Sequence, residues 1–268
     1  GFAAEALHVL RRDPQSARDL YGAWQGNLLV GAAWVAPLPG AVALVWPPCG
    51  TQDPSAAAGL WSCVDAAIRT QHAKLGQIVL PEVDEPTAAA MTAHGFVPLT
   101  ALVYLKRTLE RVPRTPPEGM TLAPVDRQSP ALADLLPRTY EGSLDCPELD
   151  GLRTVDEVLE GHAGDPTMNE AHWWIIKTTG QDSGVVLVNA DRAAPLWDLV
   201  YFGLVPAARG RGRGRRVRGW LLEQAQSHGA RILSVAVDCR NGVALRLYEG
   251  LGFKRFDHRQ VWWRGGGR

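Results

Sequence analysis

At Arg209-Gly-Arg-Gly-Arg-Gly-Arg-Arg216, the sequence alternates arginine and glycine between an apolar run, Leu196–Val205, and a segment with helical spacing, Arg215–His228. Glycine lets the backbone approach a ligand closely and adopt a positive φ. The start of a helix offers free N–H groups and the positive end of a dipole, and both favour anions. Arginine adds fork-shaped, charge-assisted hydrogen bonds to phosphate oxygens. The stretch therefore predicts a loop that binds a compact polyphosphate, such as the diphosphate of a nucleotide cofactor.

Other phosphate-binding and nucleic-acid-binding patterns compete for this Arg/Gly stretch. It lacks the Gly-Lys-Ser/Thr ending of a P-loop. A dinucleotide fingerprint requires a further glycine three residues after the second one, and positions 215 and 217 hold no glycine to complete that pattern with Gly210, Gly212 and Gly214. An arginine-rich segment that binds nucleic acid and stays disordered until bound is the alternative. The position of the stretch between two well-patterned elements, away from either end of the chain, disfavours that alternative.

Strands and helices are expected to alternate in the C-terminal half. Thr154 and Glu157 have the spacing of a capping box before a helix over 155–161, and Gly180–Gly184 reads as the turn of a hairpin. Ile232–Val237 is mostly apolar and is expected in the centre of a sheet. The expected strands are Thr121–Val125, His172–Thr178, Gly184–Asn189, Leu196–Val205, Ile232–Val237 and Phe253–Trp263. The expected helices are Pro130–Tyr140, 155–161, Arg215–His228 and Gly242–Gly250.

The N-terminal half repeats the later part of this order, which predicts a domain duplication. Prolines and a glycine within 110–119 disfavour helix and central strand, so this run is expected to be a linker between domains 1–112 and 119–268. The fold class is α/β with a mixed α+β sheet, and each domain is expected to hold a central mixed sheet flanked by helices. The expected N-terminal elements are strands Asn27–Val35, Ala41–Trp46, Gln77–Leu80 and Phe96–Lys106 and helices Ala56–Lys74 and Thr87–His94.

A second motif, Asn241-Gly-Val-Ala-Leu-Arg-Leu-Tyr-Glu-Gly-Leu-Gly-Phe253, follows the Arg/Gly stretch after an expected helix and strand. In this order, the two segments resemble the GCN5-related N-acetyltransferase (GNAT) superfamily, whose cofactor motif is [QR]-x-x-G-x-[GA] after a strand. The resemblance covers residues 121–263 well and 1–110 weakly. The corresponding N-terminal loop, Trp46–Pro54, has no such motif, and the counterpart of Tyr248 is Met91. The N-terminal half therefore looks like a degenerate copy without cofactor chemistry.

The resemblance implies an acyltransferase that moves an acetyl group from acetyl-CoA, used as co-substrate, to an amine by direct attack in a ternary complex. Tyr248 is the candidate acid beside the CoA sulfur, because a phenol stays protonated at neutral pH and can donate. In this family the strand splays from its neighbour near Leu204 and Val205, and the main-chain N–H near Leu204 is then the oxyanion donor. The residues expected to bind the cofactor are Leu204, Val205, Pro206, Arg209, Gly210, Arg211, Gly212, Arg213, Gly214, Arg215, Arg216, Asn241 and Tyr248.

Asp198 is the candidate base that accepts the proton of the amine. It lies six residues before Leu204 on the same expected strand, and an even offset places both side chains on one face of a sheet. Because aspartate is short, a relaying water is an alternative, and Glu141 is the reserve candidate. The acidic segment Tyr140–Asp150 is expected to attract a cationic amine acceptor.

Composition bounds these expectations. The sequence has 28 basic and 28 acidic residues, so any electrostatic partner must meet a local patch, and this balance argues against a nucleic-acid binder. The four cysteines form no CxxC pair, so no metal site is expected and the thiols are expected to be reduced in a cytoplasmic protein. No apolar run approaches the length of a membrane span. The start, Gly1-Phe-Ala3, lacks an initiator methionine and a signal-peptide pattern, which suggests that the native N-terminus lies upstream.

Three functions remain in competition at this point. The first is an N-acetyltransferase for a small-molecule amine, with one CoA bound in the C-terminal half only. The second is a GNAT-shaped acyl-CoA sensor or scaffold without turnover, and the third is a nucleic-acid binder. The sequence leaves the acceptor, the acyl chain and the choice between monomer and homodimer open.

Overall fold

The structure is a computed structural model that describes residues 17, 19–110, 112, 117–164, 169–210 and 212–265. The chain divides into two compact units, Gly1–Thr100 with Arg259–Arg268 and Ala101–His258. Within the part of the chain described, no helix is long and apolar enough to cross a membrane.

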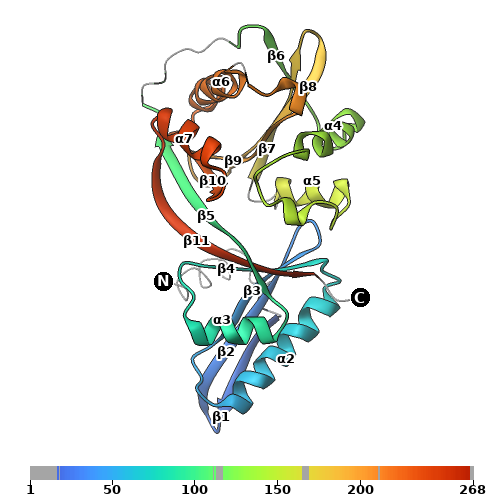
Figure 1. The fold of residues 1–268 in the computed structure, drawn as a ribbon. Coiled ribbons are helices and arrows are strands. Elements are labelled where there is room, and N and C mark those ends of the chain that lie inside the picture. Colours follow the sequence, from blue (N-terminus) through green and yellow to red (C-terminus); the bar gives the residue numbers. More distant parts are fainter. Residues whose placement is uncertain are drawn as a thin grey trace. The chain divides into compact units, whose positions relative to one another are not determined.

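In its described residues, the first unit is a mixed sheet covered by the helices α2 and α3 (Figure 1). Its sheet has the order β1-β2-β3-β4-β11, in which β3 and β4 are parallel and the other neighbouring strands are antiparallel. Strand β1 was not predicted, although Gly26-Asn27 between β1 and β2 is a recognisable two-residue hairpin turn. The elements are β1 (Leu20–Gln25), β2 (Leu28–Leu38), β3 (Val42–Cys49), α2 (Pro54–Thr70), β4 (Leu75–Leu80), α3 (Glu85–Ala93), the start of β5 (Val97–Thr108) and the end of β11 (Lys254–Gly265).

Helices α2 and α3 each begin at an aspartate that caps the helix. The side chain of Asp53 accepts a hydrogen bond from the Ser55 N–H, and that of Asp84 accepts one from the Thr87 N–H. Each carboxylate satisfies main-chain donors that the helix leaves unpaired at its start. The apolar face of α2 then packs on the sheet to form one core, which includes Val35, Leu60, Trp61, Val64, Ile68, Ile78 and Phe96.

The second unit is a mixed sheet with helices on both faces (Figure 1). Its strand order is β11-β5-β10-β9-β8-β7-β6, with β10 parallel to β9 and antiparallel to β5. The predicted hairpin is confirmed as β7 and β8, and the predicted capping box of Thr154 and Glu157 is present. Besides β5 and β11, the elements are β6 (Met120–Pro124), α4 (Pro130–Tyr140), α5 (Val155–Ala163), β7 (Asn169–Thr178), β8 (Gln181–Asp191), β9 (Leu196–Leu204), α6 (Arg213–Ser227), β10 (Ile232–Asp238) and α7 (Gly242–Gly250).

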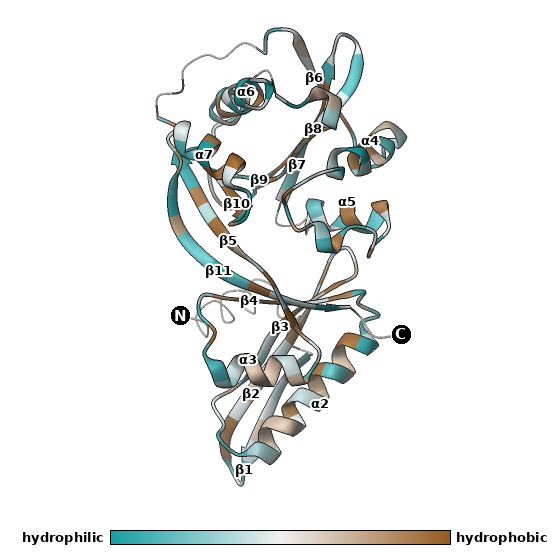
Figure 2. Cartoon of the chain, viewed as in Figure 1, coloured by the Kyte–Doolittle hydropathy of each residue, from teal (hydrophilic) through white to brown (hydrophobic). Residues whose placement is uncertain are grey.

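Two apolar cores cover the two faces of the second sheet. Helices α6 and α7 pack on one face through residues such as Val217, Leu221 and Leu245. Helices α4 and α5 pack on the other face through residues such as Leu136 and Leu159. Figure 2 shows both hydrophilic and hydrophobic residues along α6, as expected for a helix with one buried face.

Strand β9 is irregular at two places that matter for the site. A β-bulge lies at Val200, because Leu187 pairs with Tyr201 while the next residue of β8 pairs with Leu199. In addition, β9 pairs with β10 only over Leu196–Leu199, so the two strands separate beyond that point. The splay expected from the GNAT resemblance is therefore present in the structure.

The boundaries of the compact units differ from the expected domains 1–112 and 119–268. Residues Leu102–Thr108 of β5 pair with β10 in the second unit, and Gln260–Gly265 of β11 pair with β4 in the first. Arg264, near the end of the chain, donates to Asp65 Oδ1 at 2.6 Å and to the His94 carbonyl at 2.7 Å within the first unit. Each half of the chain thus contributes half a strand to the unit built mainly by the other half.

Candidate functional site

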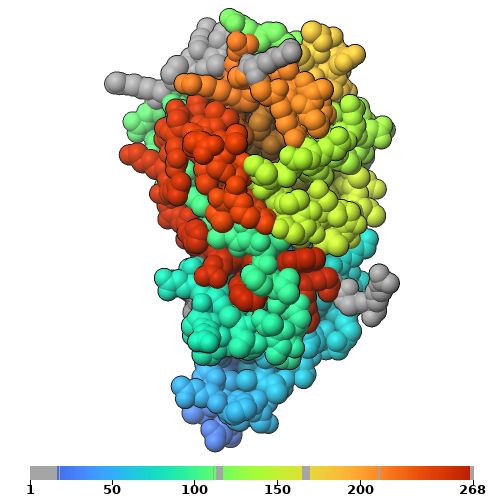
Figure 3. Space-filling view, viewed as in Figure 1, coloured from blue at the N-terminus to red at the C-terminus, as the bar shows by residue number. Residues whose placement is uncertain are grey.

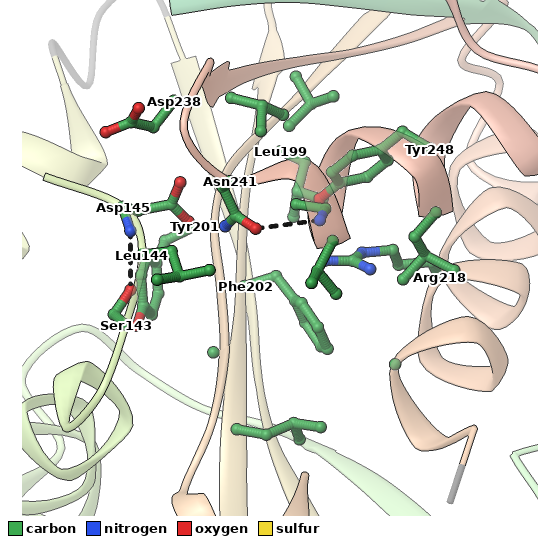
Figure 4. A pocket seen from close by; sticks show the side chains of 18 of the residues that line it. Ser143, Leu144, Asp145, Leu199, Tyr201, Phe202, Arg218, Asp238, Asn241 and Tyr248 are labelled. Carbon is green, nitrogen blue, oxygen red and sulfur yellow. Dashed lines mark hydrogen bonds between the residues drawn. The ribbon is translucent and has the colours of Figure 1, made fainter. Parts of the chain in front are cut away.

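The second unit contains a cleft of about 590 Å³ where β9 and β10 separate. Figure 3 shows a hollow in the surface between the orange segment of α6, the red segment of α7 and the yellow-green residues that follow α4. Figure 4 shows side chains from β9, α6 and α7 and from the loop after α4 converging there. The cleft thus joins the two motifs of the sequence at one place.

One end of the cleft is formed by the glycines of the Arg/Gly stretch. Gly210 and Gly212 have φ values of +74° and +71°, and Gly212 is the residue at which α6 begins. Gly214 and the exposed Arg215 line the cleft one turn further on. Left-handed glycines before a helix start are a suitable shape for an anion, because main-chain N–H groups face it without side chains in the way. Arg211 lies outside the described residues.

The side chain of Arg209 is already engaged within the protein. Its Nε donates to the Leu204 carbonyl at 3.0 Å, and its two terminal nitrogens donate to the carbonyls of Thr139 and Gly142, each at 3.1 Å. Arg209 therefore fastens the end of β9 to the end of α4, where helix carbonyls need donors. The expectation that its guanidinium binds phosphate is not supported by this geometry.

Unlike Arg209, the arginines Arg213 and Arg216 lie outside the cleft lining. Arg213 donates to the Ala208 carbonyl at 3.1 Å, and the exposed Arg216 reaches the Glu118 carbonyl at 3.4 Å. Of the described arginines between 209 and 216, Arg215 is the one that lines the cleft and forms no side-chain hydrogen bond or ion pair with the described residues. Within the described part of the loop, the anion-binding capacity therefore rests on the main chain and on Arg215.

The main chain of β9 faces the cleft through alternate residues. The Val205 N–H donates to the Ser183 carbonyl of β8 at 2.9 Å, which makes Ser183 and Val205 a hydrogen-bonded pair. Because such pairs alternate in an antiparallel ladder, the N–H and C=O groups of Leu204 and Phe202 point away from β8 and toward the splayed side. This geometry is compatible with the prediction that the main-chain N–H near Leu204 is the oxyanion donor. Val205 and Pro206 do not line the cleft, and Phe202 is the residue that the sequence analysis missed.

Tyr248 of α7 lies at the inner wall of the cleft and is only 3% exposed. Its ring makes an edge contact with Phe253, with ring centroids 5.3 Å apart. Burial raises the pKa of Tyr248 above its ordinary value, and the charge and hydrogen bond of Arg218 oppose that rise. The phenol therefore carries its proton at neutral pH, as a general acid must.

Arg218 of α6 is a second cleft residue that the sequence analysis did not single out. It is 8% exposed, and its guanidinium carbon lies 4.4 Å from the Phe202 ring centroid and 4.3 Å from that of Tyr248. Figure 4 shows its side chain reaching from α6 toward these two rings. A signal was present in the sequence, because Arg218 occupies a position of the α6 face that is otherwise apolar.

Asp198 does not share a face with Leu204. The flanking Trp197 and Leu199 pack with Leu204 in the core under α6 and α7, so Asp198 points to the opposite face. The bulge at Val200 shifts the alternation by one residue, and this makes the even-offset argument wrong. Asp198 lines a separate cavity of about 330 Å³, where it accepts a hydrogen bond from Ser234 Oγ at 2.8 Å.

The remaining predicted residues are placed as follows. Asn241 lines the cleft and caps α7, its Oδ1 accepting from the Ala244 N–H at 3.0 Å. Glu141, the reserve base, is exposed at the end of α4 and does not line the cleft. Among the described residues, no group of three or more His, Cys, Asp or Glu side chains is arranged to hold a metal ion.

Comparison with known sequences supports the assignment of the motifs. Residues 134–253 match the family model described as the acetyltransferase (GNAT) family. The mycothiol acetyltransferase of Thermomonospora curvata is 29% identical over 178 residues, which are 64% of this chain and 57% of the relative. The mycothiol acetyltransferase of Thermobispora bispora is 30% identical over 183 residues, which are 65% of this chain and 60% of the relative. The chain thus spans less than two thirds of the length of either relative.

Comparison with solved structures supports the fold. A tandem GNAT protein from the clavulanic acid biosynthesis pathway superposes with a TM-score of 0.57 at 18% identity, covering 93% of this chain and 83% of that one. The superposition covers both compact units of this chain, and the solved protein is described as a tandem GNAT protein. Together with the Arg/Gly loop and the splayed strands, the family match shows that residues 134–253 are similar to the acetyltransferase (GNAT) family.

Proposed function

We propose that this protein is an acetyl-CoA-dependent N-acetyltransferase acting on a small-molecule amine. The observation that carries the proposal is the single cleft in which an anion-binding helix start, a splayed strand and a protonated tyrosine meet. The family normally uses acetyl-CoA as the acyl donor. The names of the two mycothiol acetyltransferases favour a small molecule as the acceptor.

The described residues fit the two ends of CoA. The diphosphate would lie at the start of α6 against the main chain of Gly210, Gly212 and Gly214, with the Arg215 guanidinium at its side. The pantetheine arm would lie along β9, where the main-chain groups of Phe202 and Leu204 point to the splayed side. The Leu204 carbonyl already accepts a hydrogen bond from Arg209, so the Leu204 N–H and the main-chain groups of Phe202 are the ones left for the amides of this arm.

The proposed chemistry uses two groups of this chain at the thioester. The Leu204 N–H stabilises the negative charge that develops on the carbonyl oxygen when the amine attacks. The Tyr248 hydroxyl donates its proton to the sulfur as the carbon–sulfur bond breaks. The C–N bond that forms leaves the acetyl group on the amine, and no acyl group is attached to the protein.

The first test measures thiol release from acetyl-CoA across a panel of amines for the wild type and Tyr248→Phe. We expect turnover with at least one amine, and a kcat lowered by roughly 10²-fold or more in the variant, because phenylalanine keeps the ring but has no proton to donate. The affinity for CoA should be unchanged. Tyr104→Phe, outside the cleft in β5, is the matched control.

Two outcomes would count against this function. Tight CoA binding with no turnover for any amine would favour an acyl-CoA sensor that uses the same cleft. Equal rates for the wild type and Tyr248→Phe would be consistent with acetyl transfer but would show that Tyr248 is not the general acid.

A cytoplasmic location of the protein remains a prediction from the sequence.

A further inference from the structure

Asp145 brings a carboxylate into the cleft from the loop that follows α4. The residue is exposed as a whole, but its side chain is directed toward Asn241 across the cleft (Figure 4) and lines the cleft wall. Burial raises the pKa of this carboxylate, and the neighbouring Asn241 side chain and Asp238 main chain oppose that rise. Val237 and Cys239 form the hydrogen-bonded pairs with β5. The main-chain groups of Asp238 between them therefore point away from β5, to the splayed side of β10.

The loop around Asp145 is held in place by its neighbours. Cys146 has a left-handed backbone with φ of 43°, which is uncommon for a residue other than glycine. Its N–H and its Sγ lie 3.2 Å and 3.5 Å from Asp238 Oδ2. Arg240 bonds the same Asp238 carboxylate at 2.7 Å and Glu148 at 2.5 Å. This network of bonds fixes the backbone next to Asp145, and a catalytic carboxylate needs such positioning.

The other carboxylates near the cleft already have cationic partners or lie elsewhere. Of the described residues that line the cleft, Asp145 and Asp238 are the carboxylates, and Asp238 is paired with Arg240. Glu148 shares that arginine, and Asp198 lies in the separate cavity. Among the described residues, Asp145 forms no salt bridge, although the Arg218 charge is near enough to lower its pKa, so its negative charge is available to a ligand.

We propose that Asp145 is the general base of the reaction and that the acceptor binds as an ammonium ion paired with this carboxylate. The inference rests on the proposed acetyl transfer. It narrows the acceptor to amines that are protonated at neutral pH, such as alkylamines. It also replaces Asp198 and Glu141, neither of which lines the cleft.

The protons of the reaction balance with Asp145 and Tyr248 in these roles. The ammonium nitrogen gives one proton to the Asp145 carboxylate and becomes a neutral amine that can attack the acetyl carbon. As the C–N bond forms and the C–S bond breaks, the sulfur takes the Tyr248 proton, and a second proton leaves the nitrogen to restore Tyr248. The products are the amide and the free thiol, and Asp145 returns its proton to solvent.

The charged groups around Asp145 suit a base. Partial burial raises the pKa of Asp145 above its ordinary value, the Asp238 carboxylate adds to that rise, and Arg218 opposes it. The Cys146 thiol stays neutral because burial and Asp238 raise its pKa to about 12. A carboxylate with a raised pKa takes up a proton more readily than a carboxylate with an ordinary pKa.

The test compares the wild type, Asp145→Asn and Asp145→Glu over a range of pH, with alkylamines and with aryl amines that are neutral at pH 7. For alkylamines at pH 7, we expect Asp145→Asn to lose roughly 10²- to 10⁴-fold in kcat/KM. The loss should shrink as pH rises toward the pKa of the amine, and it should be small for aryl amines. Asp145→Glu should retain part of the activity, because it keeps a carboxylate.

Asp150→Asn is the matched control, because Asp150 is exposed on the same loop and does not line the cleft. CoA affinity, measured by calorimetry, should be the same in all variants. A loss that is equal at every pH and for every amine, or no loss at all, would overturn the role of Asp145 while leaving acetyl transfer intact. Wild-type protein that binds CoA and turns over no amine would instead refute the proposed function.

Discussion

At the scale of single residues, Arg218 carries a charge where the rest of the helix face is apolar. A buried guanidinium loses hydration, and its contacts with the faces of Phe202 and Tyr248 offset part of that loss. Its Nε has no hydrogen-bond partner within the described structure. Arg218 therefore stabilises the core less than a leucine would. Its clearer effect is on the pKa of Tyr248, whose rise it opposes.

Replacing Arg218 by methionine should change the pH dependence of the reaction. Arg218 opposes the rise of the Tyr248 pKa, so its removal moves that pKa further up. A less acidic phenol is a weaker proton donor, so kcat should fall while the alkaline limb of the pH–rate profile moves to higher pH. Arg216→Met, on an exposed face of the same helix, is the control. An alkaline limb that stays in place would show that Arg218 does not act through Tyr248.

Asp198 shows what a residue-scale argument from sequence can miss. Strict alternation along Asp198–Leu204 predicted that the two side chains lie on the same face of the sheet. The extra residue at Val200 shifts the alternation, so they lie on opposite faces. A bulge depends on how two strands pair, and nothing in the local sequence of β9 announced it. Asp145 was visible only as one of several acidic residues, because its approach to Asn241 depends on contacts between distant segments.

At the scale of elements, the start of α6 is the feature on which cofactor binding depends. The helix begins after Gly212, which has no side chain to cap it, so the Gly214 N–H is left for a ligand while the Arg213 and Arg215 N–H groups donate to carbonyls of the loop. The loop and this helix were predictable because glycine pattern and apolar spacing are local signals. The same holds for the Thr154 capping box and the β7–β8 hairpin.

Gly212→Ala should weaken CoA binding without preventing folding. Alanine in a left-handed conformation costs about 1–2 kcal/mol, and the loop can relieve that strain by changing shape. A changed loop should raise the dissociation constant for CoA by about tenfold or more. Gly229→Ala carries a similar backbone strain, with φ of +84°, at the other end of α6. This control should lower thermal stability alone, and equal CoA affinity in both variants would contradict the prediction.

The partner of β11 illustrates what element-scale reasoning leaves open. A closing strand over Phe253–Trp263 was expected, and β11 is present as Lys254–Gly265. Its second half pairs with β4, which lies far back in the sequence. Local pattern marks a strand, whereas its neighbour is set by the packing of the whole unit. The boundaries of the two compact units could not be read from the linker for the same reason.

At the scale of the whole molecule, the two units share a plan but differ at the start of one helix. In the first unit β3 pairs with β4 only over Val42–Leu44, and a cavity of about 560 Å³ follows, as at the splay of β9 and β10. The helix that comes next begins with Asp53 and Pro54. The Asp53 carboxylate occupies the position of an anion, and proline removes one N–H donor. Glu82 and Asp84 add further negative charge to the cavity wall.

These charges predict that each chain binds one CoA, in the second unit. Calorimetry with the full chain should give a stoichiometry of one. Gly212→Asp should abolish binding, because it places a carboxylate at the start of α6 much as Asp53 does at the start of α2. Asp53→Asn, which keeps a side chain able to cap α2, should bind CoA like the wild type. A second equivalent of CoA, or binding that survives Gly212→Asp, would mean that the first unit also holds the cofactor. The acidic wall around Asp84 would then have to be screened by a bound cation.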